Sequence, residues 1–70
     1  MLINKPNIDL LALRNERNWT QEDTAKHLGF SRSYYSEVEI GKQSISTKMM
    51  YAIIKVFGVQ YEDFFKDLKG

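Results

Sequence analysis

The sequence has 70 residues, of which 43% are hydrophobic and 27% charged, with no cysteine, one histidine and a formal net charge of +1. This composition is typical of one soluble globular domain, and it excludes disulfides and thiolate metal sites. The small net charge does not by itself indicate a nucleic acid partner, so that case depends on where the charges lie.

The N-terminal part has no apolar run near the ~20 residues of a membrane span and no secretory signal pattern, which favours a cytoplasmic protein. We expect residues 1–6 to be a flexible tail, with a short strand pairing across a dimer as the alternative. The first helix is expected to begin near Asn7 as N-cap, with Asp9 in its first turn. It should run to about Arg17, because Asn18 tolerates the left-handed conformation that ends a helix.

Two short helices follow, joined by a turn that contains glycine. The second should begin at Thr20 as N-cap, with Asp23 in the place of a capping-box acid, and stop at Gly29. The third, about 31–39, should begin with Ser31 as N-cap. Two helices joined by such a turn are typical of a helix-turn-helix.

The rest of the chain is expected to form two more helices. The fourth should begin at Ser46 or Thr47 and run to Phe57, and the fifth should cover about 61–68. Apolar spacing of i, i+3, i+4, i+7 gives the fourth helix one buried face. The sequence therefore predicts an all-α, compact five-helix single domain over residues 1–70.

The exposed start of the third helix carries side chains that can read base edges. Arginine can bond to guanine O6 and N7, glutamate can accept from cytosine N4, and serine can contact either kind of edge. Tyrosine can cover a thymine methyl group or reach a phosphate. The predicted base contacts are Arg32, Ser33, Tyr34 and Glu37.

One combination of residues resembles a known family over about Leu10 to Phe65. The matching motifs are Leu10-x-x-Leu13-Arg14, Thr20-Gln21, Ala25, Leu28-Gly29 and Glu39-x-Gly41-Lys42. They resemble the phage Cro and repressor helix-turn-helix family, also called the xenobiotic-response-element family of bacterial regulators. The resemblance implies a lambda-repressor-like fold, a bacterial or phage source and a double-stranded DNA operator as partner.

The resemblance also implies roles for single residues. Gln21 would touch a phosphate and brace the recognition helix, while Arg14 and Glu39 would form an internal ion pair. An arginine on an apolar helix face needs such a partner, because an unpaired buried charge is costly. The expected phosphate contacts are Gln21, Ser31, Lys42, Gln43 and Ser44.

Three positions depart from the family pattern. Thr24 replaces the usual leucine and Tyr35 the usual valine or isoleucine, so we hypothesise that their volumes compensate. Glu37 is less common than a neutral or basic residue, and it weakens non-specific attraction to phosphates. Its alternative role is a local pair with Arg32 or Ser33.

The C-terminal segment is more apolar than a monomer of this size needs, which indicates a partner surface. The expected homodimer interface comprises Tyr61, Phe64, Phe65 and Leu68. The leading interpretation is a homodimeric repressor on a pseudo-palindromic operator, located on the nucleoid when bound to DNA. The alternative is a protein-interaction module, antitoxin-like or a regulator's partner, that uses the same surface. No enzyme activity, cofactor, metal or small-molecule ligand is expected, because no catalytic or phosphate-binding motif is present.

Overall fold

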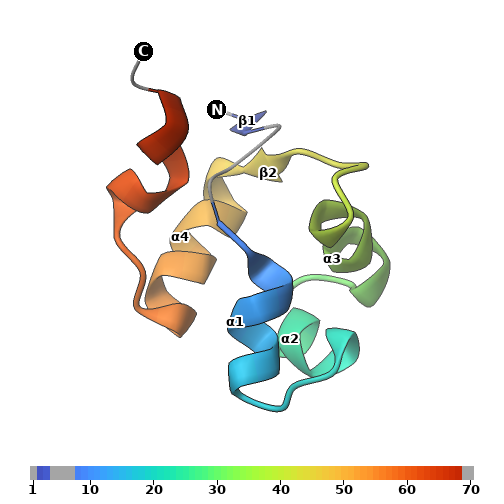
Figure 1. Ribbon diagram of the computed structural model, residues 1–70. Helices are drawn as coiled ribbons and strands as arrows, with labels where there is room; N and C mark the ends of the chain where they lie inside the picture. Colours follow the sequence, from blue (N-terminus) through green and yellow to red (C-terminus); the bar gives the residue numbers. More distant parts are fainter. Residues whose placement is uncertain (1, 4–7, 69–70) are drawn as a thin grey trace.

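The computed structural model describes residues 2–3 and 8–68, and it is largely helical (Figure 1). The expected all-α class is confirmed, but the expected five helices are not, since the described residues contain four α-helices. The elements in chain order are β1 (Leu2–Ile3), α1 (Leu10–Glu16), α2 (Gln21–Leu28), α3 (Arg32–Glu39), β2 (Ile45–Ser46), α4 (Thr47–Phe57) and the 3-10 helix η1 (Tyr61–Leu68).

Side-chain caps account for the starts of the helices. Thr20 and Asp23 form a reciprocal capping box at α2, as expected, and Ser31 accepts a hydrogen bond from the backbone of α3. At α1 the N-cap is Asp9, whose carboxylate accepts from the N–H of Ala12. The expected cap Asn7 lies outside the described residues, and Asp9 was wrongly placed inside the first turn.

Residues 1–6 were expected to form a flexible tail or a short strand, and Leu2 and Ile3 form the short strand β1. These residues pair antiparallel with β2 of the same chain, in the register Leu2 to Ser46 and Ile3 to Ile45. The extended segment before α4 has backbone groups that no helix can satisfy, and the second strand gives them partners. The alternative of strand pairing across a dimer is therefore not needed to explain β1.

The fifth segment is a 3-10 helix and not an α-helix. At its start the N–H of Asp63 donates to the carbonyl of Gln60 at 3.0 Å, a bond that spans three residues instead of four. The Asp63 carboxylate accepts in turn from the N–H of Gln60 at 2.9 Å. These two local bonds tighten the chain directly after α4.

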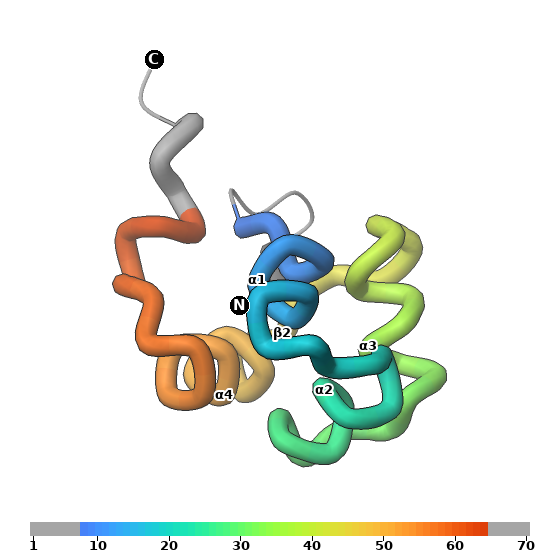
Figure 2. The backbone as a smooth tube through the Cα atoms, turned by 60° about the horizontal axis from the view of Figure 1, so that its bottom comes forward, coloured from blue at the N-terminus to red at the C-terminus, as the bar shows by residue number. Residues whose placement is uncertain are grey.

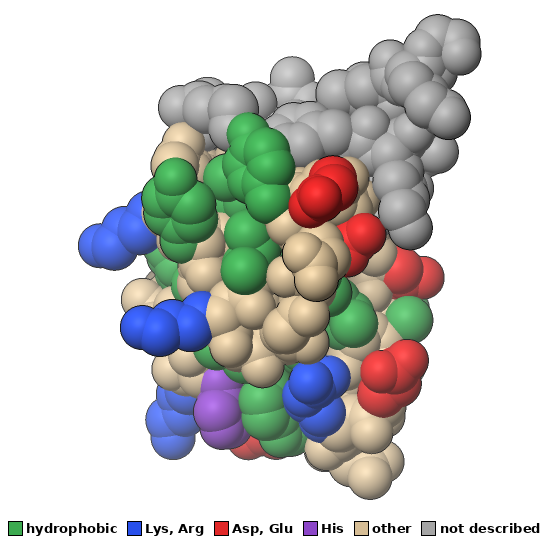
Figure 3. All heavy atoms as spheres, turned by 90° about the vertical axis from the view of Figure 1, so that its left-hand side faces the viewer, with side chains coloured by type: hydrophobic (Ala, Val, Ile, Leu, Met, Phe, Trp, Pro, Cys, Tyr) green, Lys and Arg blue, Asp and Glu red, His purple; other side chains and the backbone are tan. Residues whose placement is uncertain are grey.

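The helix α3 and the segment that leads into η1 lie on opposite sides of the molecule, in both ribbon and tube views (Figures 1 and 2). The face on the η1 side shows hydrophobic side chains gathered in its upper part (Figure 3). Tyr51 of α4 is 62% exposed and Tyr61 of η1 is 49% exposed. This surface is therefore separate from the start of α3.

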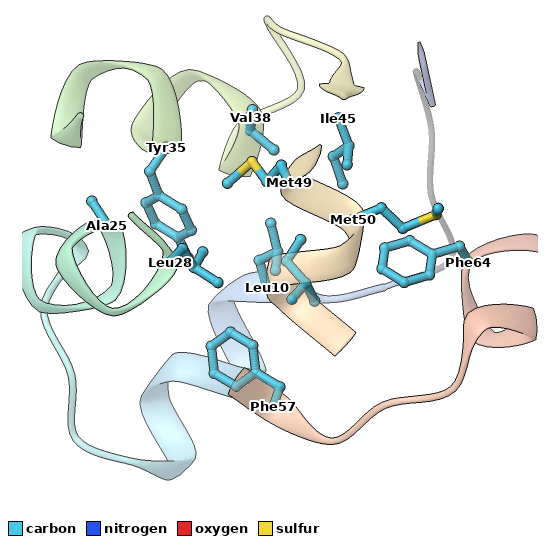
Figure 4. Packing of buried hydrophobic residues seen from close by; sticks show 11 residues of the cluster. Leu10, Ala25, Leu28, Tyr35, Val38, Ile45, Met49, Met50, Phe57 and Phe64 are labelled. Atoms are coloured by element: carbon cyan, nitrogen blue, oxygen red, sulfur yellow. The ribbon is translucent and has the colours of Figure 1, made fainter. Parts of the chain in front are cut away.

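The core lies between the helices and includes residues from α1, α2, α3, β2, α4 and η1 (Figure 4). Ala25, at 2% exposure, permits the close approach of α2 and α3. Phe64, which was expected at a dimer interface, is only 1% exposed and packs in the core of the described monomer. Ile45 and Met49 are also buried, although the sequence pattern did not single them out.

Candidate nucleic-acid interface

The turn between α2 and α3 is fixed by backbone geometry. Gly29 has a φ of 84°, in the left-handed region where most residues are strained. The N–H groups of Gly29 and Phe30 both donate to the carbonyl of Ala25, at 2.9 and 3.0 Å. These bonds end α2, and Ser31 then starts α3 at once, so the second helix has a defined direction relative to the first.

The carboxylate of Glu39 joins α3 to the two preceding helices. Arg14 of α1 lies against it, with Nε 2.6 Å from Oε2 and Nη2 3.3 Å from Oε1. Gln21 of α2 donates from Nε2 to Oε1 at 2.7 Å. Tyr35 of α3 donates from its hydroxyl to Oε2 at 2.7 Å. The structure therefore brings together the two residues expected to form the internal ion pair, and adds Gln21 and Tyr35 to them.

These contacts change the proton affinities of the groups. Burial raises the pKa of Glu39, but hydrogen bonds from Arg14, Gln21 and Tyr35 outweigh it, so the pKa lies below the ordinary value. The hydrogen bond to Glu39 raises the pKa of Arg14. Burial and the same carboxylate raise the pKa of Tyr35. Glu39 is therefore an anion surrounded by three donors at neutral pH.

The start of α3 is open to solvent. Ser31, Arg32 and Ser33 are all exposed. Within residues 8–64, no hydrogen bond or ion pair involves the side chains of Arg32 or Ser33. The Ser31 oxygen accepts from the N–H of Tyr34 at 3.1 Å, which leaves its hydroxyl hydrogen to donate elsewhere. This surface can therefore offer several donors to a ligand without breaking bonds inside the protein.

Tyr34 has a role that the sequence did not predict. Its hydroxyl donates to the carbonyl of Ser44 at 2.8 Å and accepts from the N–H of Ser46 at 3.4 Å. The ring is partly buried and lies 5.4 Å from the ring of Phe30, measured between centroids. A base contact by this hydroxyl would compete with bonds that hold the segment after α3.

The loop after α3 is joined to that helix by hydrogen bonds to Glu37. The carbonyl of Glu37 accepts from the N–H groups of Lys42 and Gln43, at 2.8 and 3.2 Å. The carboxylate accepts from the side-chain amide of Gln43 at 3.1 Å. No ion pair joins Glu37 to Arg32 in the described part of the chain, so the local partner of the carboxylate is Gln43 and not the alternative partner Arg32.

The remaining site residues divide into exposed and buried ones. Lys42 and Gln43 are exposed, whereas Ser44 is partly buried. Thr24 and Tyr35, the two departures from the family pattern, are both fully buried. The side chains of Phe65 and Leu68, expected at a dimer interface, lie outside the described residues.

Two other kinds of site receive no support from the described residues. No group of three or more His, Asp or Glu side chains among them lies close enough to hold a metal ion. None of their helices has both the length and the apolar content to span a membrane.

Comparisons with known proteins agree with this geometry. A family model described as helix-turn-helix matches residues 10–64. An uncharacterized HTH-type transcriptional regulator from Methanocaldococcus jannaschii is 50% identical over 48 residues, which cover 69% of this chain and 73% of the relative. Another from Archaeoglobus fulgidus is 40% identical over 52 residues, covering 74% and 73%. No solved structure matches the chain. Both relatives are archaeal, so they lend no support to the bacterial or phage source that the resemblance implied.

Proposed function

The chain belongs to the Cro/repressor-like helix-turn-helix family, and from this premise we propose that it is a sequence-specific transcriptional regulator that binds double-stranded DNA. The family model matches residues 10–64, which are most of the described residues, so the family assignment does not depend on a short motif alone. Both archaeal relatives carry the name of transcriptional regulators, which supports the same function here.

One observation carries the proposal: the start of α3 is exposed while its end is fixed. Glu39 fastens α3 to α1 and α2 through Arg14 and Gln21. A helix held at one end can present its other end to a major groove about 12 Å wide without losing further freedom on binding. In this arrangement Arg32 reads guanine, Ser33 contacts a neighbouring base edge and Glu37 accepts from cytosine.

Contacts to the sugar-phosphate backbone would flank this helix. Lys42 is exposed in the loop directly after α3, and Ser31 retains a free hydroxyl hydrogen. Gln21 uses one amide hydrogen on Glu39, and its second remains to donate to a phosphate. Such contacts fix the position of the protein on the duplex, whereas base contacts select the sequence.

We infer further that the protein acts as a homodimer and represses transcription by occluding the operator. Tyr51 of α4 and Tyr61 of η1 are large side chains that remain exposed, and the segment that leads into η1 lies on the side opposite α3 (Figures 1 and 2). Two recognition helices related by a two-fold axis can read successive major grooves when they lie about 34 Å apart, the spacing of one DNA turn. A pseudo-palindromic operator would then be read by both copies.

The exposed apolar surface also favours a second candidate function. Leu11 of α1 is 46% exposed and Tyr51 of α4 is 62% exposed, and exposed apolar side chains can contribute to docking a different protein. In that case the chain would be a protein-interaction module of the same fold, antitoxin-like or a partner of another regulator, and its affinity for DNA would be weak and independent of sequence.

The deciding experiment is selection of duplexes from a random pool, followed by affinity measurements at several salt concentrations. A dimeric operator reader enriches a two-fold-symmetric site, and its affinity falls steeply with salt because phosphate contacts release counterions. A folded protein that enriches no sequence contradicts the DNA proposal and supports the interaction module.

A pair of variants makes this test specific. Arg32→Ala should lower affinity for the selected site about tenfold, the effect of one good base contact, and relax the preference at one position. Lys55→Ala removes a cation from the last turn of α4 and serves as the control. Equal losses in both variants would show that only overall charge matters, and would contradict the assignment of α3.

A further inference from the structure

The loop after α3 is attached to a single residue of the recognition helix. The backbone carbonyl of Glu37 accepts two N–H groups of the loop, from Lys42 and Gln43. The side chain of Gln43 then returns to the carboxylate of the same residue at 3.1 Å. Gly41, with a φ of 86°, makes the sharp reversal that this requires. Gln43 is thus bound to Glu37 through both its backbone and its side chain.

A glutamate in the recognition helix has a particular difficulty beside DNA. Its side chain has several rotamers, and fixing one of them costs conformational entropy. The phosphates of the duplex repel its charge, which favours rotamers that point away from the groove. A neutral donor that already holds the carboxylate opposes both effects, because the carboxylate keeps one orientation before DNA arrives.

We propose that Gln43 is a positioning residue that holds the Glu37 carboxylate for cytosine recognition, and that it thereby sets the base preference at one position of each half-site. The inference rests on the proposed function, because it assumes that α3 reads DNA. Gln43 occupies Oε1 of Glu37, and Oε2 remains to accept the N4 hydrogen of cytosine.

This role differs from the phosphate contact that the sequence predicted for Gln43. A residue that contacts a phosphate contributes equally to all sequences, since phosphates carry no sequence information. A residue that positions Glu37 contributes only where cytosine is read, and only while Glu37 is present. The two roles therefore predict different patterns of affinity.

The experiment is a double-mutant cycle on the selected operator. Wild type, Glu37→Ala, Gln43→Ala and the double variant are measured on duplexes that differ at one base pair, the position where the Glu37→Ala pool no longer prefers cytosine. We expect wild type to prefer cytosine about tenfold and Gln43→Ala less than about threefold. In the Glu37→Ala background, Gln43→Ala should change nothing further. Lys42→Ala, a neighbour in the same loop, should weaken all duplexes equally and leave the preference intact.

Three outcomes would overturn the inference. An equal loss from Gln43→Ala on every duplex, with or without Glu37, would assign Gln43 to a phosphate. A cytosine preference that survives Gln43→Ala would show that Glu37 needs no support. A Glu37→Ala pool identical to that of wild type would show that Glu37 reads no base. If wild type enriches no site at all, the proposed function itself fails, and circular dichroism of each variant shows whether folding is the cause.

Discussion

At the residue scale, the carboxylate of Glu39 joins three helices through hydrogen bonds. Three donors from three helices share its two oxygens, and its side chain is only 7% exposed. A buried ion pair is weak evidence for net stability, because desolvation offsets much of the attraction. Its loss is nevertheless costly, since the remaining charge and donors are left unsatisfied.

We expect Glu39→Ala to lower the free energy of unfolding by about 2 kcal/mol, because Arg14, Gln21 and Tyr35 lose their acceptor. Urea unfolding monitored by circular dichroism measures this. Arg14→Ala should cost a similar amount, and the double variant should cost clearly less than the sum. Additive losses would mean that the pair is not coupled, and Glu16→Ala, an exposed acid on α1, controls for charge alone.

A second expectation at this scale concerns acid. The pKa of Glu39 is lower in the folded protein than its ordinary value of 4.5, because hydrogen bonds from Arg14, Gln21 and Tyr35 outweigh burial. The hydrogen bond from the Thr20 backbone lowers the pKa of Asp23 in the same way. A lowered pKa contributes stability above the unfolded value, and this is lost as pH falls through the folded value.

The free energy of unfolding should therefore be level at neutral pH and decline below about pH 4.5, the ordinary value for glutamate. Glu39→Gln should be less stable at pH 7 and should decline less steeply in acid. Unfolding titrations between pH 7 and pH 3 test both statements. A decline as steep in Glu39→Gln as in wild type would assign the acid sensitivity to other carboxylates.

Three side-chain contacts show which parts of the site could be predicted from the sequence. The contact between Arg14 and Glu39 was anticipated from the family resemblance, and its physical reason is that a charge on an apolar helix face needs a partner. The bond from Tyr35 to Glu39 was missed, although the spacing of four residues puts both on one face of α3. The bond from Tyr34 to Ser44 could not have been predicted, since it depends on the path of a loop.

At the element scale, the turn between α2 and α3 depends on one backbone conformation. Gly29 has a φ of 84°, and a Cβ built there would meet no atom within 4 Å. Gly29→Ala should therefore cost about 1–2 kcal/mol from the left-handed backbone alone. Gly29→Asn should cost less, because asparagine tolerates that conformation better.

Thermal unfolding measures the Gly29 variants, and a loss of 1 kcal/mol corresponds to a fall of about 4–8 °C in Tm for a domain of this size. Should Gly29→Asn prove as harmful as Gly29→Ala, the cause would be something other than backbone strain. Ser33→Ala, at an exposed position of α3, is the control for a small change in a neighbouring helix.

Elements with a local signal were predicted better than elements set by tertiary packing. Caps and left-handed stops are local, and those at Thr20, Ser31 and Gly58 were anticipated. The pairing of β1 with β2 joins residues more than forty positions apart, which no local pattern encodes. The 3-10 form of η1 also escaped prediction, because its apolar spacing fits an α-helix equally well.

At the scale of the whole molecule, the two proposed activities use different sides. The start of α3 and the segment leading into η1 lie apart in both views (Figures 1 and 2). A second copy bound on the η1 side would leave α3 accessible to DNA. This arrangement requires that some side chains of η1 pack in the core of the monomer while others stay exposed to contact a second copy.

Phe64 and Tyr61 should therefore respond differently to substitution. Phe64 is 1% exposed, so Phe64→Ala should lower the stability of the monomer by about 3–5 kcal/mol, regardless of protein concentration. Phe64→Leu, a milder change, keeps the test usable if the first variant does not fold. Tyr61 is 49% exposed, so Tyr61→Ser should leave the folded monomer intact and weaken self-association, measured by sedimentation equilibrium.

The opposite results would change the assignment of Phe64 to the core and of Tyr61 to the dimer interface. If Phe64→Leu abolished the dimer while the monomer kept its stability, Phe64 would have to leave the core on association. If Tyr61→Ser changed neither association nor DNA affinity, the η1 side would not be the dimer interface. The two recognition helices would then need another two-fold axis, and the exposed Leu11 on α1 would be the next surface to vary.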